Sequence, residues 1–316
     1  MRLFSTLFLL TLYSISCLAS DYPPADVPME LQKVSEHVYF VQGVAGVATD
    51  NEGFVSNAGV VITDAGVVVF DSLGTPSLAD KLLQKIRTVS DKPIVRVVVS
   101  HYHADHIYGL QVFEEQGADI WAPTGAEKYL ASPNAAERLE ERRLSLDPWV
   151  NDNTRLVAPD RYIDKQEKFS LGGVDFTLSP IGAAHSDGDM TLYIEPDRVL
   201  FSGDVIFEGR VPFMGDANSK HWLEVLQHMQ NRRLVALVPG HGAAAHDPNK
   251  AIAGTLSYLA YLRKTMGAAV ADFVPFDEAY AAADWSPFEK LPAFSEANRR
   301  NAYQVYLSME AESLGQ

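Results

Sequence analysis

Short apolar runs separated by polar turns occupy the first two thirds of the chain, with stretches of helical spacing between them. The segment 56–72 contains two β-branched runs joined by Asp64-Ala65-Gly66, which is a typical hairpin turn signal. Residues 78–89 repeat apolar side chains at the spacing of an amphipathic helix. This pattern predicts strands interleaved with helices.

The same alternation continues beyond the first helix. Further strands are predicted at VSEHVYFVQG (34–43), IVRVVVS (94–100), VDFTLSPIGAAH (174–185), TLYIEPDRVLFSGD (191–204) and LVALVPGHG (234–242). Helices are predicted over 125–130, from residue 135 onward and over 222–229. After His241 the pattern is helical and rich in alanine and aromatic residues, which predicts a helical C-terminal extension over 251–316. The predicted class is α/β with a mixed sheet.

The first nineteen residues differ in kind from the rest. Arg2 precedes an apolar run that ends in small residues, which predicts a signal peptide cleaved after Ala19 and export to a bacterial periplasm. A lipid anchor on Cys17 and an N-terminal helix of the folded domain remain as alternatives. Cleavage would remove Cys17, the only cysteine. No other segment approaches the roughly 20 apolar residues of a membrane-spanning helix.

Charge narrows the range of partners. The chain has 41 acidic and 26 basic residues, a net charge of −15 that becomes −16 when Arg2 is removed. A field of this sign repels phosphate backbones, so nucleic-acid binding is not expected. The densest basic stretch, 138–143, is half neutralised by its own glutamates. A small-molecule substrate is the expected partner.

Three of the nine histidines lie within the hexapeptide HYHADH, residues 101–106. His101 and His103 are spaced to project from one side of an extended segment, and a loop can bring Asp105 and His106 back to a second position. Imidazole and carboxylate are natural ligands of zinc and similar divalent ions. The hexapeptide therefore predicts a metal site at the end of the strand 94–99.

Three more candidate ligands each follow a predicted strand. They are His185 after SPIGAA, Asp204 at the end of VLFSGD, and His241 at the end of LVALVPGH. The four remaining histidines are interpreted as packing or surface residues: His37, His221, His228 and His246.

The motifs HYHADH, GAAHSDGD, FSGD and VPGHG, in this order, resemble those of the metallo-β-lactamase superfamily. The resemblance runs from about Val34 to Gly242 and implies an αββα sandwich, with the catalytic domain over 28–250. It also implies a ligand set. One metal would be bound by His101, His103 and His185, the other by Asp105, His106 and His241, with Asp204 as a bridge and Asp71 supporting the ligand loop.

The implied cofactors are two Zn²⁺ ions, with iron or manganese as alternatives. Two such ions share a water, lower its pKa and make hydroxide available as the bridging nucleophile. Asp105 is expected to orient the hydroxide and to shuttle a proton to the leaving group. The expected reaction is hydrolysis of an ester, thioester or amide bond, with β-lactams among the candidate amides.

Features within the superfamily narrow the subgroup. One large class of zinc β-lactamases has a cysteine at the second metal, where this chain has Asp204. Glyoxalase II-like thioesterases share the Asp105-His106 pair but follow it with two glycines, where this chain has Tyr108-Gly109. The segment 201–226 with VPGHG after it looks like exported zinc hydrolases associated with sulfur oxidation and quinoprotein dehydrogenases. That likeness implies a periplasmic quinoprotein or c-type cytochrome system as partner.

The segment after Asp204 is also expected to form a wall of the substrate pocket. Candidates there and beside the ligand loop are Tyr108, Phe207, Arg210, Phe213 and Trp222. Arg210 can bind a carboxylate in bidentate fashion. Alternatively, the aromatic residues belong to the core and Arg210 forms a structural ion pair. Two other functions remain open: an iron oxidoreductase of the same fold, and a periplasmic metal-binding or assembly protein without turnover.

Overall fold

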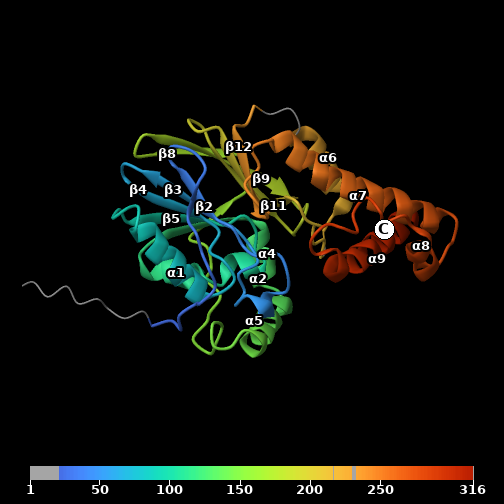
Figure 1. Ribbon diagram of the computed structural model, residues 1–316, viewed down its shortest axis with the longest axis horizontal. Helices are drawn as coiled ribbons and strands as arrows, with labels where there is room; N and C mark the ends of the chain where they lie inside the picture. The colour runs from blue at the N-terminus through green and yellow to red at the C-terminus, as the bar shows by residue number, and fades with distance from the viewer. Residues whose placement is uncertain (1–20, 216, 230–232, 316) are drawn as a thin grey trace, which may run out of the picture.

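Two β-sheets lie face to face with helices on their outer faces (Figure 1). The computed structural model describes residues 21–215, 217–229 and 233–315. The predicted signal peptide and Cys17 lie outside these residues. The layered architecture and the C-terminal helices confirm the predicted αββα class with a helical extension.

The first sheet has seven strands in the order β1 to β7. Neighbouring strands from β1 to β4 are antiparallel, and those from β4 to β7 are parallel. The strands are β1 (Gln32–Lys33), β2 (Val38–Val41), β3 (Ala58–Thr63), β4 (Gly66–Phe70), β5 (Ile94–Val98), β6 (Asp119–Pro123) and β7 (Arg161–Ile163). The predicted Asp64-Ala65-Gly66 turn joins β3 to β4.

The second sheet has five strands in the order β12-β11-β10-β9-β8. Its pairs are antiparallel except β11 with β12, which is parallel. The strands are β8 (Glu167–Leu171), β9 (Val174–Gly182), β10 (Asp189–Ile194), β11 (Val199–Phe207) and β12 (Ala236–His241). All nine residues of β11 are buried, because both faces of this strand are covered.

The core between the sheets is built mainly of aromatic and β-branched side chains, with leucine, methionine and alanine among them, from both inner faces. Phe70 of β4 stacks on Phe201 of β11, with ring centroids 5.3 Å apart. Gly59 of β3 makes room for that stack, because a Cβ there would lie 2.2 Å from the Phe201 ring. The sheets can therefore approach closely only while residue 59 has no side chain.

Helices cover the outer faces of both sheets. On the first sheet lie α1 (Pro76–Arg87), α2 (Ala104–Ile107), α3 (Leu110–Glu115), α4 (Gly125–Leu130) and α5 (Pro133–Ser145). A short 3₁₀ turn, η1, spans Ala48–Asp50. Helix α1 begins as a capped helix should: Pro76 occupies its first turn and the Thr75 hydroxyl accepts from the Leu78 amide.

Helix α6 (Ser219–Met229) and part of α7 (Pro248–Ala271) lie beside the second sheet, and α8 (Phe276–Ala282) and α9 (Phe294–Ser313) pack on α7. We call α7, α8 and α9 together the C-terminal lobe, which projects to one side of the sandwich in Figure 1. Helix α7 contacts α6, β11, α8 and α9 and so joins the lobe to the second sheet. Within the described residues, no helix has both the length and the hydropathy needed to cross a bilayer.

The structure differs from the sequence prediction in several elements. Strands β1, β6, β7 and β8 and helix α3 were not predicted; the exposed residues of β8 carry no strong apolar pattern. Asp105 and His106 were expected in a loop, but they lie on the one-turn helix α2. His103 keeps an extended backbone as the N-cap residue, and the helical turn begins directly after it at Ala104.

We expect Gly59→Ala to destabilise the protein by about 1–3 kcal/mol, because the new methyl group would collide with the Phe201 ring between the sheets. The matched control is Gly254→Ala in α7, where a Cβ has no heavy atom within 4 Å. That exchange should raise stability by up to about 1 kcal/mol through helix propensity. Urea unfolding midpoints of the two variants test this; equal stability would contradict the packing argument.

Candidate metal centre

Five imidazoles and two carboxylates converge where strands of the two sheets end. The first sheet contributes the segment after β5, and the second contributes the β9–β10 loop, β11 and the end of β12. The seven residues are those predicted from the sequence: His101, His103, Asp105, His106, His185, Asp204 and His241. Their potential ligand atoms form three overlapping groups, each with all of its atoms within 4.8 Å of one another.

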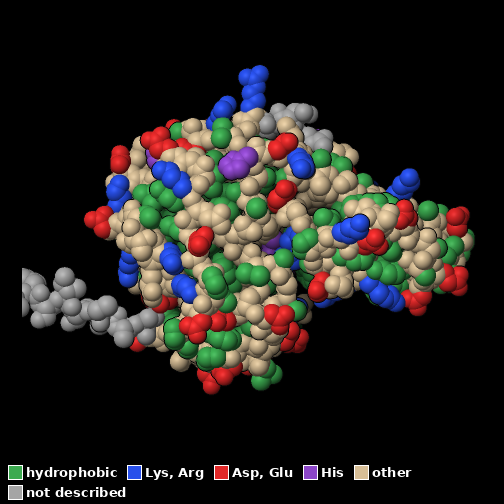
Figure 2. Space-filling model, in the orientation of Figure 1, with side chains coloured by type: hydrophobic (Ala, Val, Ile, Leu, Met, Phe, Trp, Pro, Cys, Tyr) green, Lys and Arg blue, Asp and Glu red, His purple; other side chains and the backbone are tan. Residues whose placement is uncertain are grey.

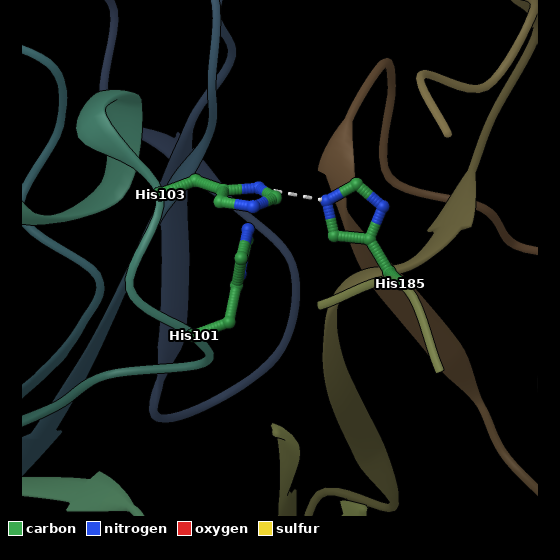
Figure 3. A group of neighbouring side chains, drawn as sticks. All are labelled: His101, His103 and His185. Carbon is green, nitrogen blue, oxygen red and sulfur yellow. Dashed lines mark hydrogen bonds between the residues drawn. The ribbon is translucent and has the colours of Figure 1, made fainter. Parts of the chain in front are cut away.

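The first group comprises His101, His103 and His185. In Figure 3 the rings of His103 and His185 approach from opposite sides, and the ring of His101 points between them. The Nδ1 atom of His103 lies 3.0 Å from the Nε2 atom of His185. Three nitrogen atoms therefore border one small volume.

The second group comprises Asp105, His106 and His241. The Asp105 Oδ2 atom lies 3.4 Å from His106 Nε2 and 3.3 Å from His241 Nε2. Asp204 stands between this group and the first. Its carboxylate oxygens lie 3.2 Å from His106 Nε2, 3.2 Å from His241 Nε2 and 3.3 Å from His185 Nε2.

These spacings fit two metal ions of the zinc type. With zinc–nitrogen bonds of about 2.0–2.1 Å and tetrahedral angles, two ligand atoms on one ion stand about 3.3 Å apart. The Nε2 atoms of His101 and His106 and the Oδ1 atom of Asp204 are buried and form no hydrogen bond within the described residues. Buried polar atoms are normally satisfied, so three unsatisfied atoms aimed at one volume indicate a site for cations.

Asp71 orients the ligands from behind. It follows β4 with a left-handed backbone (φ 63°) and is buried. Its carboxylate accepts from the Ser100 amide at 2.7 Å, from the Ser100 hydroxyl at 2.8 Å and from His106 Nδ1 at 2.9 Å. His106 therefore carries its proton on Nδ1, which leaves the lone pair of Nε2 free toward the centre.

Ser100 links Asp71 to His101 and so fixes the orientation of that ring as well. Because the Ser100 hydroxyl donates its single proton to Asp71, it must accept from His101 Nδ1, which lies 2.9 Å away. His241 Nδ1 lies 2.7 Å from the Val55 carbonyl oxygen, which can only accept. The Nε2 lone pairs of His101 and His241 are thus also directed at the centre. Ser100 and Val55 were not predicted, since nothing in a single sequence marks such contacts.

Asp189 holds the loop that carries His185. Its carboxylate accepts from the amides of Ala184 and Ser186 at 3.1 and 3.0 Å and from the Ser186 hydroxyl at 2.7 Å. Burial raises the pKa of this carboxyl group to about 6. The motif SDGD, which ends in Asp189, is visible in the sequence. The motif alone does not show whether this aspartate supports the loop or binds a metal.

Burial and nearby carboxylates shift the pKa values of the histidines in opposite directions. Burial lowers the pKa of His101 well below its ordinary value and that of His185 to about 3, so both are neutral and can bind a metal. For His106, burial opposes the charged form, but the carboxylates of Asp204, Asp105 and Asp71 outweigh it and raise the pKa well above the ordinary value. The carboxylates thus favour positive charge at the position where a metal ion would stand.

Three residues predicted to line the substrate pocket belong to the interior instead. Tyr108, Phe207 and Trp222 are at most 2% exposed and offer no surface to a substrate. Phe207 stacks on the His241 ring, with centroids 5.1 Å apart and planes 3° apart, and Trp222 packs edge-on against His185 at 5.3 Å. They fail as pocket residues because aromatic side chains beside a strand end can point inward as well as outward.

The other two predicted pocket residues differ from each other. Phe213 packs against the hydrophobic core beneath the C-terminal lobe, and the Arg300 guanidinium lies over its ring at 5.1 Å. Arg210 does reach the centre: its Nη1 atom lies 3.5 Å from His241 Nδ1. A small pocket adjoins the first group of ligands, lined by Tyr102, His103, Gly125, Tyr129, Ser186, Asp187 and Gly188.

Comparison with known families gives a match over the region that contains the centre. Residues 51–241 match the model of the metallo-beta-lactamase superfamily. The metallo-beta-lactamase IND-1 of Chryseobacterium indologenes is 20% identical over 210 residues, which are 65% of this chain and 77% of that protein. The acyl-coenzyme A thioesterase MBLAC2 of Gallus gallus is 28% identical over 193 residues, 55% of this chain and 68% of that protein.

Solved structures share the fold. A metallo-beta-lactamase from Pontibacter korlensis superposes with a TM-score of 0.58 at 23% identity, over 74% of this chain and 99% of that one. The sec-alkylsulfatase Pisa1 from Pseudomonas sp. superposes with a TM-score of 0.71 at 20% identity. That match spans 89% of this chain and 50% of the sulfatase chain, so it reaches into the C-terminal lobe.

We expect Asp71→Asn to weaken zinc binding about 10–100-fold, because an amide cannot accept from Ser100 and His106 together and would turn a donor toward one of them. Competition with a chromogenic chelator measures the affinity. Asp64→Asn, which alters an exposed turn carboxylate that pairs with Lys92, is the control and should bind zinc as the unaltered protein does. Equal zinc affinity of both variants would contradict the orienting role of Asp71.

Proposed function

The chain belongs to the metallo-beta-lactamase superfamily, and on that premise we propose that it is a hydrolase that uses two Zn²⁺ ions to cleave an ester, thioester or amide bond. The observation that carries the proposal is the convergence of His101, His103 and His185 on one side of Asp204 and of Asp105, His106 and His241 on the other. Structural zinc sites are usually closed and rich in cysteine, whereas this one is built of imidazole and carboxylate alone.

The donor set assigns the ligands. His101, His103 and His185 would hold one ion, and Asp105, His106 and His241 the other, with Asp204 shared between them. Bound zinc ions supply a hydroxide nucleophile at neutral pH and polarise the bond under attack. The hydrogen bonds to Asp71, Ser100 and Val55 fix the orientation of the rings, so that the Nε2 atoms of His106, His101 and His241 point inward.

Asp105 is the proposed proton carrier. Its side chain is 28% exposed, whereas that of Asp204 is only 4% exposed, so Asp105 can reach a substrate that arrives from solvent. Burial raises the pKa of this carboxyl group, but His106 and His241 outweigh burial and hold the pKa well below its ordinary value. An ionised Asp105 can accept a hydrogen bond from the attacking water, take up its proton and pass that proton to the leaving group.

The proposal covers several kinds of bond that the hydrolase could cleave. The names of the similar proteins include β-lactamases, an acyl-coenzyme A thioesterase and an alkylsulfatase. The proposal further places the protein in a bacterial periplasm after loss of residues 1–19, alongside a quinoprotein or c-type cytochrome system. This part rests on the sequence of the first nineteen residues and on the likeness of the segment 201–226 to sulfur-oxidation and quinoprotein-associated hydrolases.

The direct test is metal analysis followed by a substrate panel. The purified chain is expected to hold two zinc ions and to hydrolyse at least one of a chromogenic cephalosporin, a p-nitrophenyl ester and an acyl thioester. Loss of turnover on chelation and its return with zinc would support the proposal. Two bound iron ions with oxidative turnover, or full zinc content with no hydrolysis of any panel member, would overturn it.

We expect Asp204→Ala to lose metal and turnover together, with turnover falling by about 100-fold or more, because its carboxylate contacts ligand nitrogens of both groups. Metal content by mass spectrometry and the initial rate on the best substrate measure the two effects. Asp175→Ala, an exposed position on β9, is the control. Full metal content with unchanged turnover in Asp204→Ala would refute the bridging assignment.

A further inference from the structure

Arg210 lies at the candidate metal centre without a contacting carboxylate, and the charges of Asp204, Asp105 and Glu296 act on it only from beyond 4 Å. Its Nε atom is buried and forms no hydrogen bond, and within the described residues no carboxylate oxygen lies within 4 Å of its guanidinium nitrogens. The nearest polar group is His241 Nδ1, which donates its proton to the Val55 carbonyl and so cannot accept from arginine. A partly buried cation that lacks an anion is costly, so folds rarely retain one without a use.

Metal binding would leave less negative charge near the Arg210 guanidinium. Asp204 and Asp105 are the acidic residues of the centre, and they would each ligate a metal ion. Two divalent ions carry four positive charges against these two carboxylates. Arg210 would then border a centre of net positive charge, which favours an anionic group of an incoming molecule at this place.

The C-terminal lobe holds the segment that carries Arg210. The Val211 amide donates to the Pro292 carbonyl at 3.0 Å. The Met214 amide donates to Asn301 Oδ1 at 3.0 Å, and Asn301 Nδ2 donates to the Pro212 carbonyl at 2.6 Å. The backbone on the C-terminal side of Arg210 is therefore fixed by the lobe rather than by the sandwich.

Asn301 in turn belongs to a buried polar network between helices. Asn301 Nδ2 also donates to the Tyr258 hydroxyl at 3.0 Å, and that hydroxyl donates to Asn298 Oδ1 at 2.9 Å. Asn298 Nδ2 donates to the Tyr280 hydroxyl at 3.0 Å. Tyr258, Asn298 and Asn301 are at most 1% exposed. A fully satisfied network of this kind fixes one arrangement of α7, α8 and α9.

We propose that Arg210 binds an oxyanion group of the substrate beside the bond to be cleaved, and that the C-terminal lobe positions it through Asn301. The guanidinium fork suits a carboxylate, phosphate or sulfate group equally, since all three offer two oxygens in one plane. In Figure 2, histidine and basic side chains lie together in the hollow between the sandwich and the projecting lobe. This inference names a substrate class for the site of the proposed function and rests on that function.

The test measures anion binding directly and needs no turnover. The zinc-loaded protein is titrated calorimetrically with acetate, phosphate and sulfate, and the anion bound most tightly identifies the group. Arg210→Gln is expected to weaken that binding about tenfold or more, and Arg210→Lys less. Arg87→Gln removes an exposed arginine on α1 and should change nothing. Equal affinity in Arg210→Gln with full zinc content would overturn the proposal, whether or not the protein proves to be a hydrolase.

The role of the lobe has its own test. Asn301→Asp keeps the acceptor for the Met214 amide but loses the donor to Pro212 and Tyr258, and we expect it to weaken anion binding about tenfold with zinc content unchanged. Ser308→Ala, whose hydroxyl contacts only Glu312, is the control on the same helix. If Asn301→Asp does not fold, Tyr258→Phe decides. Unaltered anion affinity, or loss of zinc in step with it, would overturn positioning by the lobe.

Discussion

A single buried carboxylate, that of Asp71, fixes the direction of two of the five imidazoles that converge at the candidate metal centre. The Asp71 carboxylate accepts a hydrogen bond from His106 directly and contacts His101 through the Ser100 hydroxyl. Because that hydroxyl has a single proton, which it donates to Asp71, it can only accept from His101. Three donors offset part of the cost of burying this carboxylate, although burial still raises its pKa. The centre is thus oriented from the end of β4, a strand that supplies no ligand itself.

The ligands come from both sheets, so the centre exists only while the sheets keep their relative position. The Phe70–Phe201 stack sets that position within the core. At the edge, Asn57 fastens the sheets by donating from Nδ2 to the carbonyls of Pro239 and Gly242 at 2.8 and 2.9 Å. The first sheet is thereby joined to the strand end that carries His241. The packing between the sheets therefore also determines the geometry of the candidate metal centre.

Local patterns predicted the α/β class and the seven converging residues, whereas the layered sandwich was implied by the family resemblance that the same motifs carry. Histidine spacing and strand-terminal motifs survive in a linear pattern. The predictions that were wrong concerned the direction in which side chains point. Phe207 and Trp222 were assigned to a pocket, but they support His241 and His185 from within the core, since a strand end does not reveal which way a neighbouring ring points. Ser100 escaped notice because its role depends on residues 29 positions away. The helical turn under Asp105 was too short to show a period.

The hydrogen bonds that hold the segment after Arg210 share no residue with those that orient the histidines. One set runs through Asn301 and Pro292, the other through Asp71, Ser100 and Val55. Substitutions at Pro292 or Asn301 would therefore shift the guanidinium of Arg210 while the contacts that Asp71, Ser100 and Val55 make with the histidines stay in place.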